Sequence, residues 1–111
     1  MPQINFQEIF ERLKSELANL AGSTLKNYVS DAKSDAQKLL DSMKQKLEKW
    51  TILLASGELS KADFELLVNS QKDLVEMECL KQAGLAAIRI DQFKGSVFNL
   101  IVDTIFHLIP L

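Results

Sequence analysis

Residues 97–111 read VFNLIVDTIFHLIPL and constrain the fold more than any other part of the chain. If this segment is a helix, its polar side chains recur every three or four residues and form one narrow stripe. The stripe consists of Ser96, Asn99, Asp103 and His107. Apart from Thr104, the remaining surface is apolar, about twice the arc of a little over 100° that a helix buries against one neighbour. The segment therefore requires more burial than one adjacent helix supplies.

Composition indicates a single folded domain, residues 1–111, of the all-α class. The chain has 47% hydrophobic and 25% charged residues, typical of a globular protein. Its four glycines and two prolines are few, and Pro2 and Pro110 lie at the extreme ends, where they do not interrupt a helix. A net charge of −2 gives no reason to expect nucleic acid as a partner.

No targeting or membrane-spanning segment is expected. The N-terminal residues MPQINFQEIF lack the continuous apolar core of a signal peptide. No apolar run reaches the roughly eighteen residues of a spanning helix, and Asp103 interrupts the best candidate. The single cysteine, Cys79, excludes an internal disulfide. These features favour a cytoplasmic protein.

Capping signals divide the chain into two long helical arms. Asn5 with Glu8 three residues later predicts a helix start, and Ile4 and Ile9 are placed to form a hydrophobic staple. Gly57 suits the left-handed position that ends a helix. Ser60 is placed to cap the start of the next helix, in which Asp63 is the third residue. The predicted fold is a long antiparallel hairpin with arms of about 50 residues, namely 5–55 and 61–109, joined by the turn 56–60.

Two observations support the pairing of these arms. Antiparallel partners across the turn should sum to about 114, which places Leu17 beside Val97 and Ile9 beside Ile105. Charges also agree, because residues 38–49 carry four basic and two acidic side chains, whereas residues 58–78 carry six acidic and two basic ones. Pairing of these segments is therefore expected along the whole hairpin.

The first arm contains one irregularity, near Gly22. The apolar stripe that starts at Ile9 and the one that continues to Leu54 are rotated by about 100° relative to each other. The rotation falls at residues 21–24, where Gly22 weakens the helix. A kink or short break is predicted there. The alternative is one unbroken helix whose two halves face different partners.

A two-helix hairpin has no interior for the rear of the C-terminal helix, so another molecule is expected to cover it. Each large apolar side chain left in water forgoes about 1.5–3 kcal/mol. The favoured function is a non-enzymatic structural protein that self-associates through the apolar terminal halves of the hairpin, as a dimer or a larger coiled-coil-like bundle. The predicted oligomer interface comprises Phe6, Phe10, Leu13, Leu17, Phe98, Ile101, Val102, Ile105, Phe106 and Ile109.

Two alternatives use the same apolar end. A membrane-associating or pore-forming protein would insert it into lipid, although the polar stripe lacks the lysines and arginines that interfacial helices prefer. An adaptor would dock its C-terminal tip into a groove on a partner protein. Liposome flotation and co-expression with a partner distinguish these alternatives from self-association.

The sequence predicts no enzyme, no cofactor and no metal site. Asp103 and His107 lie one helical turn apart and could share a proton or a metal, but a polar tip near a helix end is the simpler interpretation. Cys79 is expected to be a packed thiol, far from any histidine or helix N-terminus that would activate it. Catalytic and cofactor-binding residues are therefore assigned to none.

Overall fold

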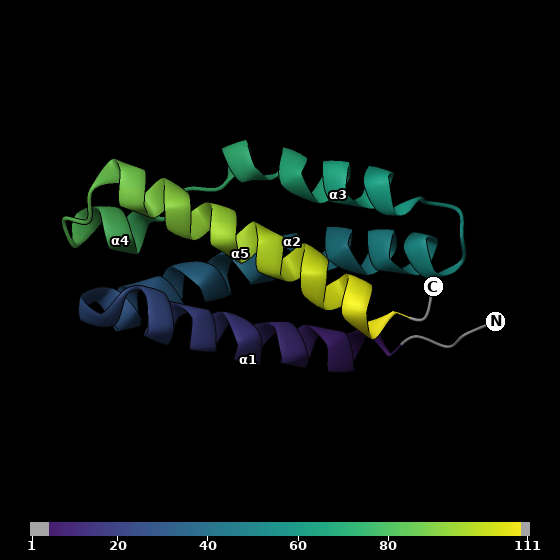
Figure 1. Ribbon diagram of the computed structural model, residues 1–111, viewed down its shortest axis with the longest axis horizontal. Helices are drawn as coiled ribbons and strands as arrows, with labels where there is room; N and C mark the ends of the chain where they lie inside the picture. The colour runs from purple at the N-terminus through teal and green to yellow at the C-terminus, as the bar shows by residue number, and fades with distance from the viewer. Residues whose placement is uncertain (1–4, 110–111) are drawn as a thin grey trace.

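The computed structural model describes residues 5–109, which form an all-α bundle (Figure 1). The expectation of an all-α protein is confirmed for these residues. Its elements, in chain order, are α1 (Phe6–Thr24), the 3₁₀ helix η1 (Lys26–Tyr28), α2 (Val29–Ala55), α3 (Lys61–Ser70), the 3₁₀ helix η2 (Lys72–Leu74), α4 (Glu78–Gln82) and α5 (Ala87–Leu108). The bundle measures 47 × 23 × 19 Å along its principal axes.

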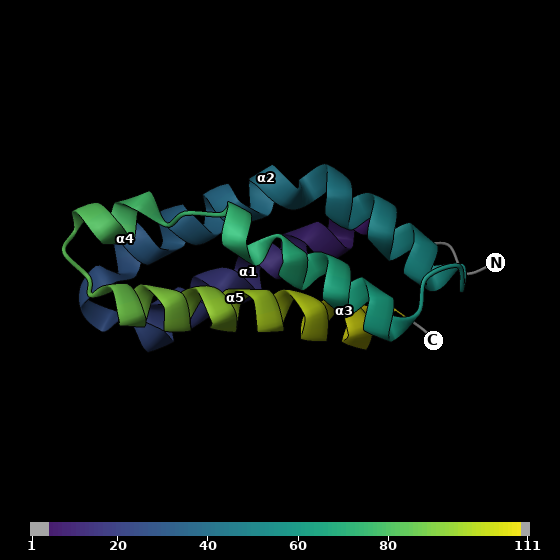
Figure 2. The ribbon, with the colours of Figure 1, turned by 90° about the horizontal axis from the view of Figure 1, so that it is seen from above.

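The predicted hairpin arms of about 50 residues are not found in the single chain, because the hairpin is folded back on itself. The chain reverses between α1 and α2, between α2 and α3, and again between α4 and α5 (Figures 1 and 2). As the pairing of the arms predicted, α2 packs against α3 and α4, and α1 packs against α5. The folding adds the contact of α1 with α2, which an extended hairpin lacks.

The irregularity predicted near Gly22 lies slightly further along the chain and is a complete reversal. Gly22 is inside α1, which ends at Thr24. Leu25, with φ −124° and ψ 68°, leaves the helical region, and Tyr28 does so with φ −132° and ψ 26°. The rotation between the two apolar stripes therefore reflects two separate helices that face a shared core.

The second arm is interrupted twice. After α3 and η2 the backbone is extended at Val75, with φ −106° and ψ 130°, before α4 begins. Gly84, with φ +91°, then ends α4. The Gly84 N–H donates to the Lys81 carbonyl and the Leu85 N–H to the Leu80 carbonyl, which is the Schellman arrangement for closing a helix. The turn at Gly84 reverses the chain, so that α5 runs back along the bundle.

The predicted caps are confirmed at three positions. The Asn5 side chain accepts a hydrogen bond from the Glu8 N–H, and Ser60 Oγ accepts one from the Asp63 N–H. Gly57, with φ +83°, closes α2, and the Glu58 N–H donates to the Leu53 carbonyl. The predicted staple residue Ile4 and the helix stop at Pro110 lie outside the described residues.

The apolar rear of α5 is buried by the chain's own helices. Phe98 and Ile101 are fully buried, and Val102 is only 4% exposed. Phe106 is half-buried, and its ring centroid lies 5.6 Å from that of Phe64 on α3. An extended hairpin offers α5 one neighbour, whereas the folded hairpin packs both α1 and α3 against it.

Candidate protein-binding surface

The residues predicted to form an oligomer interface belong to the core of the single chain. All of them except the half-buried Phe106 are buried, on α1, on α5 and at the residue that follows α5. They are Phe6, Phe10, Leu13, Leu17, Phe98, Ile101, Val102, Ile105, Phe106 and Ile109. In the folded chain these side chains pack into one core and offer little surface to a second molecule.

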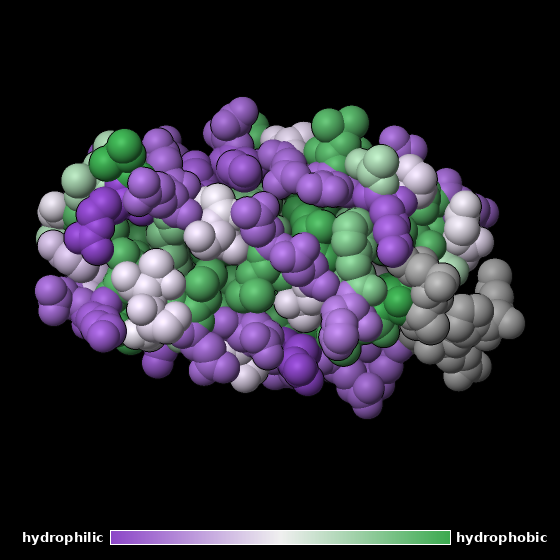
Figure 3. Space-filling view, viewed as in Figure 1, coloured by the Kyte–Doolittle hydropathy of each residue, from purple (hydrophilic) through white to green (hydrophobic). Residues whose placement is uncertain are grey.

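The large apolar side chains that are exposed lie elsewhere. Leu74 is 73% exposed, Leu66 is 69%, Ile88 is 68% and Ile52 is 52%. Figure 3 shows apolar atoms over α1 and α5 between polar rows, but α1 has no exposed large apolar side chain, and on α5 only Ile88 and the less exposed Leu108 qualify. Leu74 and Ile88 differ from Leu66 and Ile52 because each is next in the sequence to a residue that lines a groove.

This groove lies between the segment that precedes α4 and the first turns of α5. It has a volume of about 250 Å³, just below the roughly 300–1,000 Å³ of small-molecule pockets. Its lining is Val75, Glu76, Met77, Lys81, Leu85, Ala87, Ile90, Asp91 and Lys94. Leu74 and Ile88 are not lining residues themselves, but Leu74 immediately precedes Val75 in the sequence and Ile88 immediately follows Ala87.

Tertiary hydrogen bonds hold the walls of the groove in place. The ammonium group of the half-buried Lys94 on α5 donates to the backbone carbonyls of Lys72, at 3.0 Å, and Val75, at 2.8 Å. On the other side, the buried Asp35 carboxylate on α2 accepts hydrogen bonds from the N–H groups of Cys79 and Leu80 in the first turn of α4. The non-helical segment between α3 and α4 is therefore fixed from α5, and α4 from α2.

The groove carries charges of both signs. Glu76 and Asp91 are acidic, and Lys81 and Lys94 are basic. The neighbouring Glu78 has a pKa raised above its ordinary value of 4.5, chiefly because its side chain hydrogen-bonds to that of Glu76, while the Lys81 charge opposes the shift. The groove is balanced in charge and favours neither a strongly acidic nor a strongly basic partner.

The surroundings of Cys79 differ from the prediction. The residue lies in the first turn of α4, so the expectation that no helix N-terminus is nearby is wrong. Its Sγ atom is 3.5 Å from Lys38 Nζ and 3.6 Å from Ser34 Oγ, both on α2. These contacts orient the half-buried thiol toward α2 and add to the attachment of α4.

Asp103 and His107 line a shallow depression between α1 and α5, with a volume of about 310 Å³. Arg12 and Glu16 of α1 lie on its other side and form an ion pair with an Nε–Oε1 distance of 3.2 Å. Within residues 5–109, no three metal-ligating side chains come together at this or any other place. Asp103 and His107 are exposed polar residues of α5.

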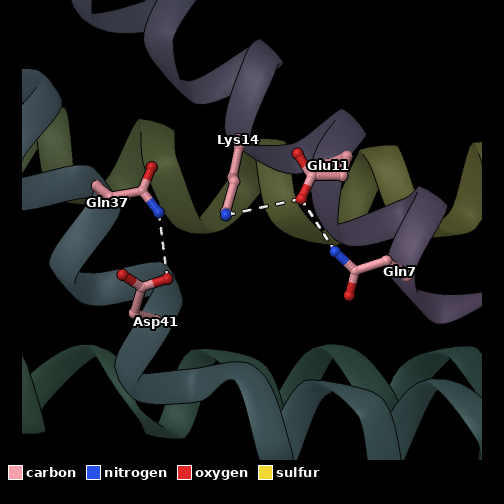
Figure 4. A network of polar contacts seen from close by, with 5 residues as sticks. All are labelled: Gln7, Glu11, Lys14, Gln37 and Asp41. Atoms are coloured by element: carbon pink, nitrogen blue, oxygen red, sulfur yellow. Dashed lines mark hydrogen bonds and ion pairs between the residues drawn. The ribbon is translucent and has the colours of Figure 1, made fainter.

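The polar contacts of the α1–α2 face run along each helix. Glu11 of α1 accepts a hydrogen bond from Gln7 at 3.0 Å and pairs with Lys14 at 3.7 Å (Figure 4). Gln37 of α2 donates to Asp41 of the same helix at 3.1 Å. Apolar packing therefore joins α1 to α2, supplemented by Lys44 Nζ, which lies 5.0 Å from the centroid of the Phe10 ring.

The fold and the surface define an all-α protein whose helices pack around one apolar core. No protein-family model matches the sequence, and no curated protein or solved structure matches it. In the part of the chain that the structure describes, none of the helices combines the length and the apolar character needed to cross a membrane.

Proposed function

We propose that this protein is a non-enzymatic assembly protein that self-associates through the groove between the α3–α4 segment and α5. The observation that carries the proposal is the strong exposure of Leu74 and Ile88, each next in the sequence to a residue that lines a groove with apolar lining residues. Apolar side chains that are exposed together are typical of protein interaction sites, whereas isolated exposed ones are ordinary.

The free energy of covering these side chains is large enough to support association. Full burial of a leucine or isoleucine side chain contributes about 1.5–3 kcal/mol. A symmetric contact buries each of them twice, once per copy. Association also costs several kcal/mol in lost rotational and translational freedom. We therefore expect a reversible dimer whose population depends on protein concentration.

A second copy of this chain is the occupant that the charges favour. Two-fold symmetry brings residue i of one copy against residue j of the other and the reverse. The exposed Glu76 and Asp91 of one groove can then pair with the exposed Lys81 of the other, while Lys94 stays bonded to the carbonyls of its own chain. Such a surface is complementary to itself.

Self-association remains the expected behaviour, but through a different surface. The rear of the C-terminal helix, where the sequence places the oligomer interface, is buried within one chain. Phe98 and Val102 gain nothing from a second molecule because they are already buried. The exposed Leu74 and Ile88 are the side chains that association would cover.

Light scattering over a range of concentrations tests the proposal with two matched variants. Ile88→Glu places a charge beside the groove, whereas Leu66→Glu places the same charge on α3 at an equally exposed leucine. We expect wild type and Leu66→Glu to dimerise with rising concentration and Ile88→Glu to remain monomeric. A wild-type protein that is monomeric at all concentrations contradicts self-association and leaves the adaptor function, with a different protein in the groove. Equal dimerisation of both variants contradicts the assignment of the surface.

A further inference from the structure

The three reversals of the chain are encoded differently. Gly57 and Gly84 have positive φ and close α2 and α4 with Schellman hydrogen bonds, so those two turns are specified locally. The reversal between α1 and α2, at residues 25–28, contains no glycine or proline and no positive φ. It is therefore the one reversal whose residues are all compatible with a continuous helix.

Few backbone changes separate this turn from a helix. Lys26 and Asn27 already belong to the 3₁₀ helix η1. Leu25 and Tyr28 have negative φ values and need no passage to the left-handed region to become helical. Leu25 is only 3% exposed, so tertiary packing contributes to holding the turn closed.

The contacts of α1 with the other helices are of a kind that a second copy can supply equally well. Its buried face is entirely apolar and consists of Phe6, Ile9, Phe10, Leu13, Leu17 and Ala21. The side-chain hydrogen bonds of α1 stay within the helix (Figure 4). The contact of Lys44 with the Phe10 ring would be restored by Lys44 of the second copy.

We infer that α1 exchanges between two copies of this chain when the turn at residues 25–28 straightens. Residues 6–55 then form one helix of about 75 Å, and α1 of each copy packs on α2 and α5 of the other. Exchange of an identical element is a low-cost route to a dimer, because the packed contacts are the same in both forms. The exchange goes beyond the proposed function, since it uses the α1–α5 contact and not the groove.

The exchanged form accounts for two features of the sequence. In a continuous helix the apolar stripes of α1 and α2 are rotated by about 100°, so the two halves face different bundles. The residues assigned to an oligomer interface from the sequence, among them Phe10 and Phe98, then meet between chains. Gly84 keeps the α4–α5 reversal closed, so α1 is the segment that exchanges.

Refolding at high concentration tests the exchange, in an Ile88→Glu, Cys79→Ser background that removes groove association and the native thiol. Thr24→Ala/Asn27→Ala favours a continuous helix, and Lys26→Gly/Asn27→Gly opposes it. The side chains at positions 24, 26 and 27 are exposed, so the substitutions leave the core intact. We expect the alanine variant to yield a severalfold larger dimer fraction on size exclusion than the background protein, and the glycine variant to yield almost none.

Two further measurements identify the dimer. X-ray scattering should show a particle longer than the 47 Å of the single chain. Cysteines introduced by Glu16→Cys and Asp103→Cys, at positions that line the same depression, should cross-link two chains in the dimer and one chain in the monomer. Monomers alone in every variant, equal dimer fractions in the alanine and glycine variants, or a dimer no longer than the monomer would overturn the inference. Such a failure leaves the groove proposal intact, because the Ile88→Glu background lacks that association.

Discussion

Asp35 on α2 accepts a hydrogen bond of 2.8 Å from the backbone N–H of Leu80 on α4, 45 residues further along the chain. Its other carboxylate oxygen accepts a 3.0 Å bond from the Cys79 N–H. A side chain from another helix thus caps α4, whose own N-cap residue, Met77, makes no side-chain cap hydrogen bond. The position of α4, and with it one wall of the groove, depends on this contact.

Replacing Asp35 with alanine should destabilise the fold by about 1.5–3 kcal/mol, because two backbone N–H groups lose a charged acceptor. Urea denaturation measures the change, and hydrogen exchange should rise first at the amides of Cys79 and Leu80. Asp41→Ala is the matched control, since Asp41 is exposed and bonds only to Gln37 of the same helix. Equal effects of the two substitutions would contradict the capping role.

Thr51→Val should stabilise the protein by about 1 kcal/mol, because valine has nearly the same shape and removes the desolvation cost of the hydroxyl. Thr51 is fully buried, and its Oγ1 has no hydrogen-bond partner among the described residues. Thr51→Ser keeps the hydroxyl and loses a methyl group, so it should destabilise by a similar amount. Thermal or urea unfolding of the pair measures both changes, and a destabilised valine variant would contradict the unpartnered state of the hydroxyl.

Alanine should have opposite effects at two glycines. Gly57 has φ +83°, where an alanine costs about 1–2 kcal/mol. Gly22 lies within α1, and an added Cβ meets nothing within 4 Å, so Gly22→Ala should stabilise the helix by about 0.5–1 kcal/mol. The two variants are compared by their midpoints of urea unfolding, with the dependence of the unfolding free energy on urea concentration unchanged. A loss of stability at both positions would argue against the helical assignment of Gly22.

The Glu78 carboxyl should titrate above its ordinary pKa of 4.5, because of its hydrogen bond to Glu76. The folded protein then holds this proton more tightly than the unfolded chain. The contribution of Glu78 to the free energy of unfolding is fully present below its pKa in the unfolded chain. It is lost as pH rises through its pKa in the folded protein. Glu76→Ala should lower the pKa of Glu78, and Lys81→Ala should raise it. Carbon-detected NMR titration measures both shifts, and an unchanged pKa in the Glu76 variant would exclude the hydrogen bond as its cause.

Local residues encode the parts of the fold that the sequence predicts correctly. The caps at Asn5 and Ser60 and the turn at Gly57 each follow from side chains within a few residues, as does the all-α class. The reversal at residues 25–28 has no helix breaker, so turn chemistry does not predict its position. The rotation of the apolar stripes is the available signal, and it is compatible with a kink as well as with a full reversal.

The candidate surface depends on contacts between distant residues. The bonds from Lys94 to the carbonyls of Lys72 and Val75 span 22 and 19 residues, and the contact of Cys79 with Lys38 spans 41. No periodicity indicates such contacts. For the same reason the sequence assigns the rear of α5 to another molecule, since its additional cover comes from α3 after the hairpin folds back.

Methyl NMR spectra recorded over a dilution series report both whether the protein self-associates and where. We expect the methyl signals of Leu74, Ile88 and Ile90 to shift with protein concentration, while those of Leu66 and Ile52 stay constant. Spectra that are independent of concentration, or shifts confined to residues away from the groove, would contradict self-association through this surface.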